Sequence, residues 1–133
     1  MDTSLRCHVE VPSKEDFLVS DRLQVLLDTV RGLCYLHNQK LEPLVHHDLT
    51  PNNNILMNIT TFQSKLADFG MTRSVPLAKL TRESSTKGTC VFMPPEALCT
   101  PRRFNEKLDV FSFGVCLAYI LSHTWPNPDH PTQ

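Results

Sequence analysis

The segment from Lys107 to Ser122 constrains the fold more than any other part of the chain, because it is the most apolar stretch among the 133 residues. Its hydrophobic side chains would occupy every face of a helix, which is typical of a helix buried at the centre of a domain. Gly114 lies inside the segment, where a glycine costs about 1 kcal/mol relative to alanine. We therefore expect Gly114 to pack closely against another backbone.

An amphipathic helix of about five turns is predicted earlier in the chain. It can begin with Ser20 or Asp21 as its N-cap, and apolar residues then recur at helical spacing as far as His37. Pro43 cannot continue a helix, so we expect the helix to end in the polar stretch that precedes it.

Shorter elements are predicted around these two helices. Ile55–Met57 and Lys65–Ala67 are apolar segments joined by a polar turn, which indicates a small hairpin. Asn58 opens a formal glycosylation sequon in that turn, but we interpret the turn as a plain polar one. Residues 12–16 predict a loop that enters a short helix, and residues 93–98 predict a short helical turn. Together the elements indicate a mainly helical α+β fold.

Residues 71–92 have almost no periodicity and many hydroxyl side chains. We expect a long loop there, because connections of this length without regular structure are usually functional or disordered.

Composition limits the classes of partner and compartment. Hydrophobic residues make up 41% of the chain, charged residues 20%, and the net charge is −1, so neither disorder nor a basic nucleic-acid-binding arm is indicated. The first residues do not resemble a signal peptide, and Val110–Leu121 is too short to cross a bilayer. We expect a cytoplasmic protein, or the intracellular part of a larger one, without a nucleic-acid partner or a membrane segment. Five widely spaced cysteines favour reduced thiols over disulfides or zinc.

Residues 44–57 contain the most suggestive polar group of the chain. Asp48 lies there between two histidines and a polar loop, and the stretch ends in an apolar run short enough to be a strand. A carboxylate in such a place suggests chemistry, but one acidic residue identifies no reaction. Its partners have to come from other segments.

Four motifs follow one another from this stretch onward. They are His-His-Asp-Leu-Thr-Pro-Asn-Asn-Asn-Ile-Leu at 46–56, Asp-Phe-Gly at 68–70, Gly-Thr-Cys-Val-Phe-Met-Pro-Pro-Glu at 88–96 and Asp-Val-Phe-Ser-Phe-Gly-Val at 109–115. In this order and at these separations they resemble the catalytic lobe of the eukaryotic protein kinases. One motif alone would be weak evidence, whereas four in register are specific. The resemblance covers nearly all of residues 1–133 and implies one partial kinase domain: a C-terminal lobe with a small β-hairpin by the catalytic loop, and no N-terminal lobe.

The resemblance implies roles for the polar residues of this region. Asp48 corresponds to the catalytic base that accepts or orients the substrate hydroxyl proton, and Asp68 corresponds to a magnesium ligand with Phe69 packed beneath it. A second magnesium ligand is an asparagine. Counting forward from Asp48 gives Asn53, whereas counting back from the following strand gives Asn54, so the loop carries one extra residue; we favour Asn53 slightly. ATP and Mg²⁺ are the implied cofactors.

Other positions have structural or regulatory roles in the family. His46 is a packed structural residue, Asp109 holds the backbone of the catalytic loop, and Leu56 lies on the nucleotide side. Glu96 matches a buried glutamate whose arginine partner would lie beyond Gln133, and leaving it unpaired would cost about 3 to 5 kcal/mol. The activation segment would include Phe69, Gly70, Thr81, Ser84, Ser85, Thr86 and Thr89.

Two substitutions bear on regulation and specificity. His47 replaces the arginine that usually pairs with a phosphate on the activation segment, and a histidine is mostly neutral at pH 7 and lacks the bidentate fork of arginine. We therefore expect phosphorylation within residues 81–86 to have little effect. Thr50 stands where serine/threonine kinases commonly have lysine and tyrosine kinases have alanine, so hydroxyl specificity stays open, with serine/threonine preferred.

Three hypotheses follow. The first is a fragment of an active protein kinase, which transfers the γ-phosphate of ATP to a serine, threonine or tyrosine hydroxyl of a protein substrate. It would need an N-terminal lobe or upstream domain, because residues 1–133 contain no glycine-rich loop, and whether this chain alone is an enzyme stays open. The alternative is a catalytically impaired, pseudokinase-like interaction or scaffold module. The third is a remnant without a stable fold.

Overall fold

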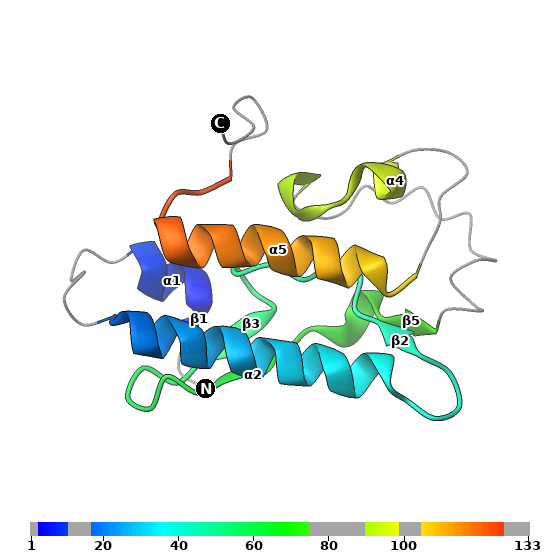
Figure 1. Cartoon of the computed structure of the whole chain (residues 1–133), viewed down its shortest axis with the longest axis horizontal. Helices are drawn as coiled ribbons and strands as arrows, with labels where there is room; N and C mark the ends of the chain where they lie inside the picture. The colour runs from blue at the N-terminus through cyan, green and yellow to red at the C-terminus, as the bar shows by residue number, and fades with distance from the viewer. Residues whose placement is uncertain (1–2, 11–16, 75–89, 99–104, 127–133) are drawn as a thin grey trace.

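The computed structural model describes residues 3–10, 17–74, 90–98 and 105–126. Its elements are arranged around two long helices (Figure 1). In chain order they are β1 (Thr3–Ser4), α1 (Leu5–Glu10), α2 (Val19–His37), β2 (Leu44–Val45), β3 (Ile55–Met57), β4 (Ser64–Leu66), β5 (Arg73–Ser74), α4 (Pro95–Leu98) and α5 (Lys107–Ser122), with 3₁₀ turns at Phe69–Met71 and Cys90–Phe92. The mainly helical α+β fold class is confirmed.

Helix α2 ends at His37, as predicted, but it begins at Val19 with Leu18 as its N-cap. The prediction of Ser20 or Asp21 as the cap was therefore wrong. The carboxylate of Asp21 lies one turn inside the helix and accepts a hydrogen bond of 3.1 Å from the backbone N–H of Leu18. It acts as the acidic member of a capping box, in which the third helical residue reaches back to the start of the helix.

Helix α5 has the predicted bounds, but it is not buried on every side. Val110, Phe111 and Leu121 are 54%, 41% and 47% exposed. A Cβ added at Gly114 would meet no described atom within 4 Å, so the close packing predicted for this glycine is not found. The apolar pattern correctly indicated a helix with a strong tendency to be covered, but periodicity alone cannot show which faces are covered.

A three-stranded antiparallel sheet in the order β1-β3-β4 lies beside α2 (Figure 1). The predicted hairpin is present as β3 and β4, with the second strand one residue earlier than expected. Asn58 forms its turn: the side-chain oxygen accepts hydrogen bonds from the backbone N–H groups of Thr60 and Thr61 at 3.0 and 2.9 Å. Asn58 therefore has a structural role in the turn.

Sequence patterns missed helix α1, which turns the chain from β1 toward the C-terminal end of α5 (Figure 1). The short helix expected after residues 12–16 is not seen at Phe17 and Leu18, which precede α2, and residues 11–16 lie outside the described part. The short helix expected within 93–98 is present as α4.

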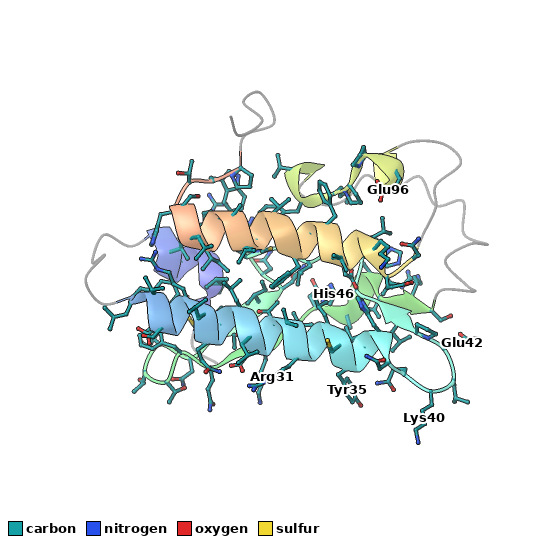
Figure 2. The ribbon with its side chains drawn as sticks, in the orientation of Figure 1. Arg31, Tyr35, Lys40, Glu42, His46 and Glu96 are labelled. Carbon is teal, nitrogen blue, oxygen red and sulfur yellow. The ribbon has the colours of Figure 1, made fainter. Side chains whose placement is uncertain are left out.

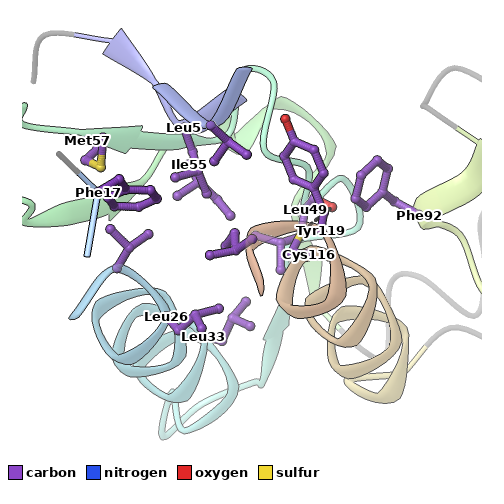
Figure 3. Packing of buried hydrophobic residues seen from close by; sticks show 13 residues of the cluster. Leu5, Phe17, Leu26, Leu33, Leu49, Ile55, Met57, Phe92, Cys116 and Tyr119 are labelled. Carbon is purple, nitrogen blue, oxygen red and sulfur yellow. Dashed lines mark hydrogen bonds between the residues drawn. The ribbon is translucent and has the colours of Figure 1, made fainter. Parts of the chain in front are cut away.

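One hydrophobic core lies between α2, α5 and the sheet (Figure 3). Helix α2 approaches β4 closely, because a Cβ on Gly32 would lie 2.9 Å from Cδ1 of Leu66. Asp28 reinforces this contact by accepting the backbone N–H of Ser64 at 3.1 Å. The buried cluster comprises Leu5, Val9, Phe17, Val25, Leu26, Leu33, Leu49, Ile55, Met57, Phe92, Cys116, Tyr119 and Ile120.

Leu49 belongs to this core and directly follows Asp48, so the core itself anchors the loop that carries the candidate base. Two of the described cysteines, Cys34 and Cys116, are free thiols, and burial raises the pKa of the Cys116 thiol. No described helix combines the length and the apolar character that a membrane span requires.

Candidate active site

The carboxylate of Asp109 organises the loop after β2. It lies in the first turn of α5, is fully buried, and accepts the backbone N–H groups of His46 at 2.8 Å and His47 at 3.0 Å. The ring Nε2 of His37, at the end of α2, lies 2.8 Å from the same carboxylate. Three donors thus satisfy a group that would be costly to bury alone. Both long helices and the loop meet at this residue.

His47 adopts a left-handed backbone conformation, with φ of 70°. Such a conformation costs a non-glycine residue on the order of 1 to 3 kcal/mol, which the surrounding hydrogen bonds must offset. Burial lowers the pKa of the His47 ring, and the positive charges of Arg73 and His46 lower it further, while Asp109 opposes them. His47 is therefore neutral at pH 7, since its ordinary pKa is already below that value.

His46 links the loop to the Asp-Phe-Gly segment. It is fully buried, its Nε2 donates to the carbonyl oxygen of Ala67 at 3.0 Å, and its ring centroid lies 5.4 Å from that of Phe69. Phe69 itself is 51% exposed, so the packing of Phe69 beneath Asp68 is less complete than the resemblance implies.

Asn54 holds Asp48 directly. Its side-chain amide donates to the backbone carbonyl of Asp48 and, at 3.0 Å, to the carboxylate oxygen Oδ2. Its own backbone carbonyl accepts the N–H of Ala67 at 2.9 Å, which fixes the residue from β4. Asn54 is 1% exposed, whereas Asn53 is exposed. The structure thus brings Asn54, not Asn53, to the candidate base.

The side-chain oxygen of Asn54, Oδ1, is buried and has no hydrogen-bond partner among the described residues. A buried acceptor without a donor is costly, so its position calls for an explanation. This amide oxygen can coordinate a cation.

Burial raises the pKa of Asp48, the hydrogen bond from Asn54 and the charge of His46 lower it, and the negative charge of Asp68 raises it. The two carboxylates are thus close enough to interact. Asp68 is exposed, has φ of 56°, and uses one oxygen to accept the N–H of Gly70 at 3.3 Å. Two carboxylates and an amide oxygen form the hard oxygen set that Mg²⁺ prefers. In the described ranges, no three histidine, cysteine, aspartate or glutamate side chains gather as a metal site.

The remaining predicted positions lie apart from this centre. Glu96 is exposed on α4 (Figure 2), so the expected cost of a buried, unpaired carboxylate does not arise. Leu56 is half-buried on β3, between two buried neighbours, and therefore faces away from the core. Five activation-segment residues lie outside the described part of the chain: Thr81, Ser84, Ser85, Thr86 and Thr89.

Sequence reasoning missed two residues that support the catalytic loop, one through Asp109 and one directly. His37 reaches Asp109 across 72 positions, and Arg6 reaches Asn52 across 46. Neither contact has a local signal, because the sequence around each residue does not specify a partner so far along the chain.

Comparison with known proteins identifies the family of the chain. The family described as protein kinase domain matches residues 3–133. The LRR receptor-like serine/threonine-protein kinase IOS1 of Arabidopsis thaliana is 43% identical over 103 residues, which is 77% of this chain and 11% of the relative. The receptor-like protein kinase HSL1 of the same plant is 36% identical over 107 residues, or 79% of this chain and 10% of the relative. The receptor-like kinase TMK4, also from that plant, is 37% identical over 101 residues, or 76% of this chain and 11% of the relative. The matched region thus spans about a tenth of these relatives.

Proposed function

Because the chain belongs to the protein kinase domain family, we propose that it carries the catalytic loop of a serine/threonine kinase, which transfers the γ-phosphate of ATP to a hydroxyl of a protein substrate. One observation carries the proposal: the buried amide of Asn54 holds Asp48 and keeps a free oxygen beside it. The preference for serine and threonine rests on relatives that bear this description.

Asp48 acts as the base in this proposal. Its carboxylate is fixed by Asn54, and its surroundings raise its pKa above that of a solvated aspartate. A raised pKa makes the carboxylate a better acceptor for the proton that leaves the substrate hydroxyl. The buried anchor at Leu49 keeps the carboxylate from moving away from that position.

Asp68 and Asn54 are the residues that would hold Mg²⁺, and Asn53 is not. Asn54 Oδ1 is a buried acceptor without a partner among the described residues, which fits a hard cation. When bound, the ion neutralises charge on the phosphoryl oxygens of ATP. This assignment replaces the slight preference for Asn53, which is exposed.

The remainder of the ATP site would be supplied by an N-terminal lobe or upstream domain. The partial kinase domain in residues 1–133 would then be part of a receptor-like protein, as the relatives' names suggest, and would act on its cytoplasmic side, as expected from the sequence. The alternative of an impaired scaffold module is not favoured, because Asp48, Asn54 and Asp68 occur together with interacting carboxylates.

The test uses the longest native protein that contains this chain. Asp48→Asn keeps the shape of the side chain and removes the base, so kcat should fall by about 100-fold to 10,000-fold, with a much smaller change in KM. Asn53→Ala is the matched control in the same loop and should leave kcat within a few-fold. Equal activity of the wild-type protein and Asp48→Asn would contradict the proposal.

Regulation forms a separate part of the proposal. A neutral His47 cannot form the charged, bidentate contact that an arginine makes with a phosphate. Phosphorylation at Thr81, Ser84, Ser85 or Thr86 should therefore change kcat by less than about threefold, as measured on singly phosphorylated protein. A rise of tenfold or more would contradict this and would point to Arg73, the cation next to His47, as the phosphate partner.

A further inference from the structure

The first described residues of the chain contact both flanks of the three consecutive asparagines at 52–54, which are called the asparagine run below. Thr3 and Ser4 of β1 pair with Met57 and Leu56 of β3, which follow the run. Two residues later, the backbone N–H of Arg6 donates to the carbonyl of Pro51, which precedes the run, at 2.9 Å. One short segment, residues 3–6, thus fixes the loop before and after the asparagines.

The side chain of Arg6 adds a third contact, which is made with the asparagine run itself. Its Nη1 donates to Oδ1 of Asn52 at 3.3 Å, and its guanidinium carbon lies 4.2 Å from the ring centre of Trp125. Trp125 is held edge-on between the rings of Phe92 and Tyr119, at centroid distances of 5.3 and 5.1 Å. The guanidinium therefore lies on the face of a ring that two other aromatic rings contact. Through its hydrogen bond, this guanidinium restrains the position of Asn52.

These contacts fix Asn52 on one side and β3 on the other, so only Asn53 and Asn54 lie between fixed neighbours. Asn54 is pinned by Ala67 and turned inward onto Asp48, while Asn53 is exposed. If Asn52 lost its contact with Arg6, the loop could accommodate its extra residue on either side of Asn54. Rotation of Asn54 would then remove the amide from Asp48.

We propose that Arg6 is a positioning residue that confines the extra residue of the loop to Asn53 and thereby keeps the side chain of Asn54 on Asp48. The proposal deepens the proposed function, on which it rests for the role of Asn54 as a magnesium ligand. Arg6 acts on Asn54 through Pro51 and Asn52.

The side-chain amide of Asn54 gives a direct readout that needs no metal and no activity. NMR of the ¹⁵N-labelled chain of 133 residues compares wild-type protein with Arg6→Ala, Arg6→Lys and Arg31→Ala. Arg31 is the matched control, because it points away from α5 on the exposed side of α2 (Figure 2) and pairs with Asp28 at 3.4 Å. Arg6→Ala should shift the Asn54 amide signals and speed their hydrogen exchange at least tenfold.

Arg6→Lys should restore most of the protection, and Arg31→Ala should not alter it. Asn52→Ala provides a second variant if Arg6→Ala does not fold, since it removes the loop contact and leaves Arg6 on Trp125; it should have the same effect. Unchanged Asn54 signals in a folded Arg6→Ala or Asn52→Ala chain would overturn the proposal.

Deletion of Asn53 supplies a sharper test. Without the extra residue the loop has no slack to confine, so Arg6→Ala should leave the Asn54 amide protected in that background. An equal loss of protection in both backgrounds would assign Arg6 a general structural role instead and would overturn the proposal.

Added Mn²⁺ separates this inference from the proposed function. In wild-type chain Mn²⁺ should broaden the Asn54 side-chain signals, and Arg6→Ala should raise the Mn²⁺ concentration needed by at least fivefold. If Mn²⁺ leaves Asn54 unaffected in the wild-type chain, the metal assignment fails, while amide exchange still decides whether Arg6 positions Asn54.

Discussion

Asp109 is the residue on which the catalytic loop depends most. Its buried carboxylate satisfies two backbone N–H groups of the loop and lies against His37. Asp109→Ala leaves these donors buried and unpaired, so we expect it to lower the free energy of unfolding by about 3 to 5 kcal/mol. Urea denaturation followed by circular dichroism measures the change.

The control for Asp109 is Glu42→Ala, which removes an exposed carboxylate from the loop before β2. A substitution of this kind should change stability by no more than about 0.5 kcal/mol. Similar losses for both variants would show that Asp109 does not hold the loop.

Asp48 has a pKa set by competing neighbours, and this gives a prediction with two opposite signs. The hydrogen bond from Asn54 lowers the pKa of Asp48, whereas the charge of Asp68 raises it. Asn54→Ala should therefore move the Asp48 titration to higher pH, and Asp68→Asn should move it to lower pH. Titration of the ¹³C carboxyl signal measures both directions, and a shift of the same sign in both variants would contradict the geometry.

The pKa of Asp48 also fixes the pH range in which the base works. Because burial raises that pKa, protonation begins at higher pH than for a solvated aspartate, and the rate of a complete kinase should fall as pH decreases through the raised value. The sign is opposite for stability: a raised carboxyl pKa means that the folded chain binds the proton more tightly than the unfolded chain, so this group lowers the free energy of unfolding as pH rises through the raised pKa.

At the scale of elements, Gly114 and Gly32 make a matched pair of helical glycines. A Cβ at Gly114 meets no described atom within 4 Å, whereas one at Gly32 would lie 2.9 Å from Leu66. Gly114→Ala should raise the free energy of unfolding by about 0.5 to 1 kcal/mol, because alanine restricts the unfolded chain and favours the helix. Gly32→Ala should gain less or lose stability. Chemical denaturation of the two variants gives the comparison, and a larger gain at Gly32 would contradict it.

Elements defined by local signals were predicted well, and those defined by distant contacts were not. The end of α2 and both bounds of α5 follow from periodicity and nearby punctuation, and the hairpin follows from two apolar runs with a polar turn. Helix α1 has only six residues and depends on burial of Leu5, which no local pattern reports.

The candidate site shows the same limit. The motifs located Asp48 and Asp68, but two counting rules left Asn53 and Asn54 open, because both use sequence spacing alone. The contacts that bring Asn54 to Asp48 come from Ala67 and Asp48 itself, and residues 3–6 hold the flanks. Spacing alone could not show that Asn54 is buried while Asn53 is exposed.

On the scale of the whole molecule, one core joins both long helices, the sheet and the catalytic loop. Leu33 of α2, Ile55 of β3 and Ile120 of α5 belong to the same buried cluster, and Leu49 brings the loop into it (Figure 3). A single shared core predicts one cooperative unfolding transition, because α2, β3 and α5 bury their side chains in the same cluster. Coincident melting curves from far-UV circular dichroism and tryptophan fluorescence would support it, non-coincident curves would contradict it, and the lack of any cooperative transition would favour a remnant without a stable fold.

Metal binding should couple to that transition. An ion that binds only the folded chain stabilises it by RT ln(1 + [L]/Kd), about 2.7 kcal/mol at a concentration 100 times the Kd. We therefore expect Mg²⁺ or Mn²⁺ to raise the melting temperature of the wild-type chain progressively with concentration. Asn54→Ala and Asp68→Asn should abolish the increase, since each removes one proposed ligand, whereas Asn53→Ala should retain it because that side chain is exposed. Loss of the increase in Asn53→Ala, with Asn54→Ala unaffected, would return the ligand to Asn53 and show that the extra residue is accommodated at the other asparagine.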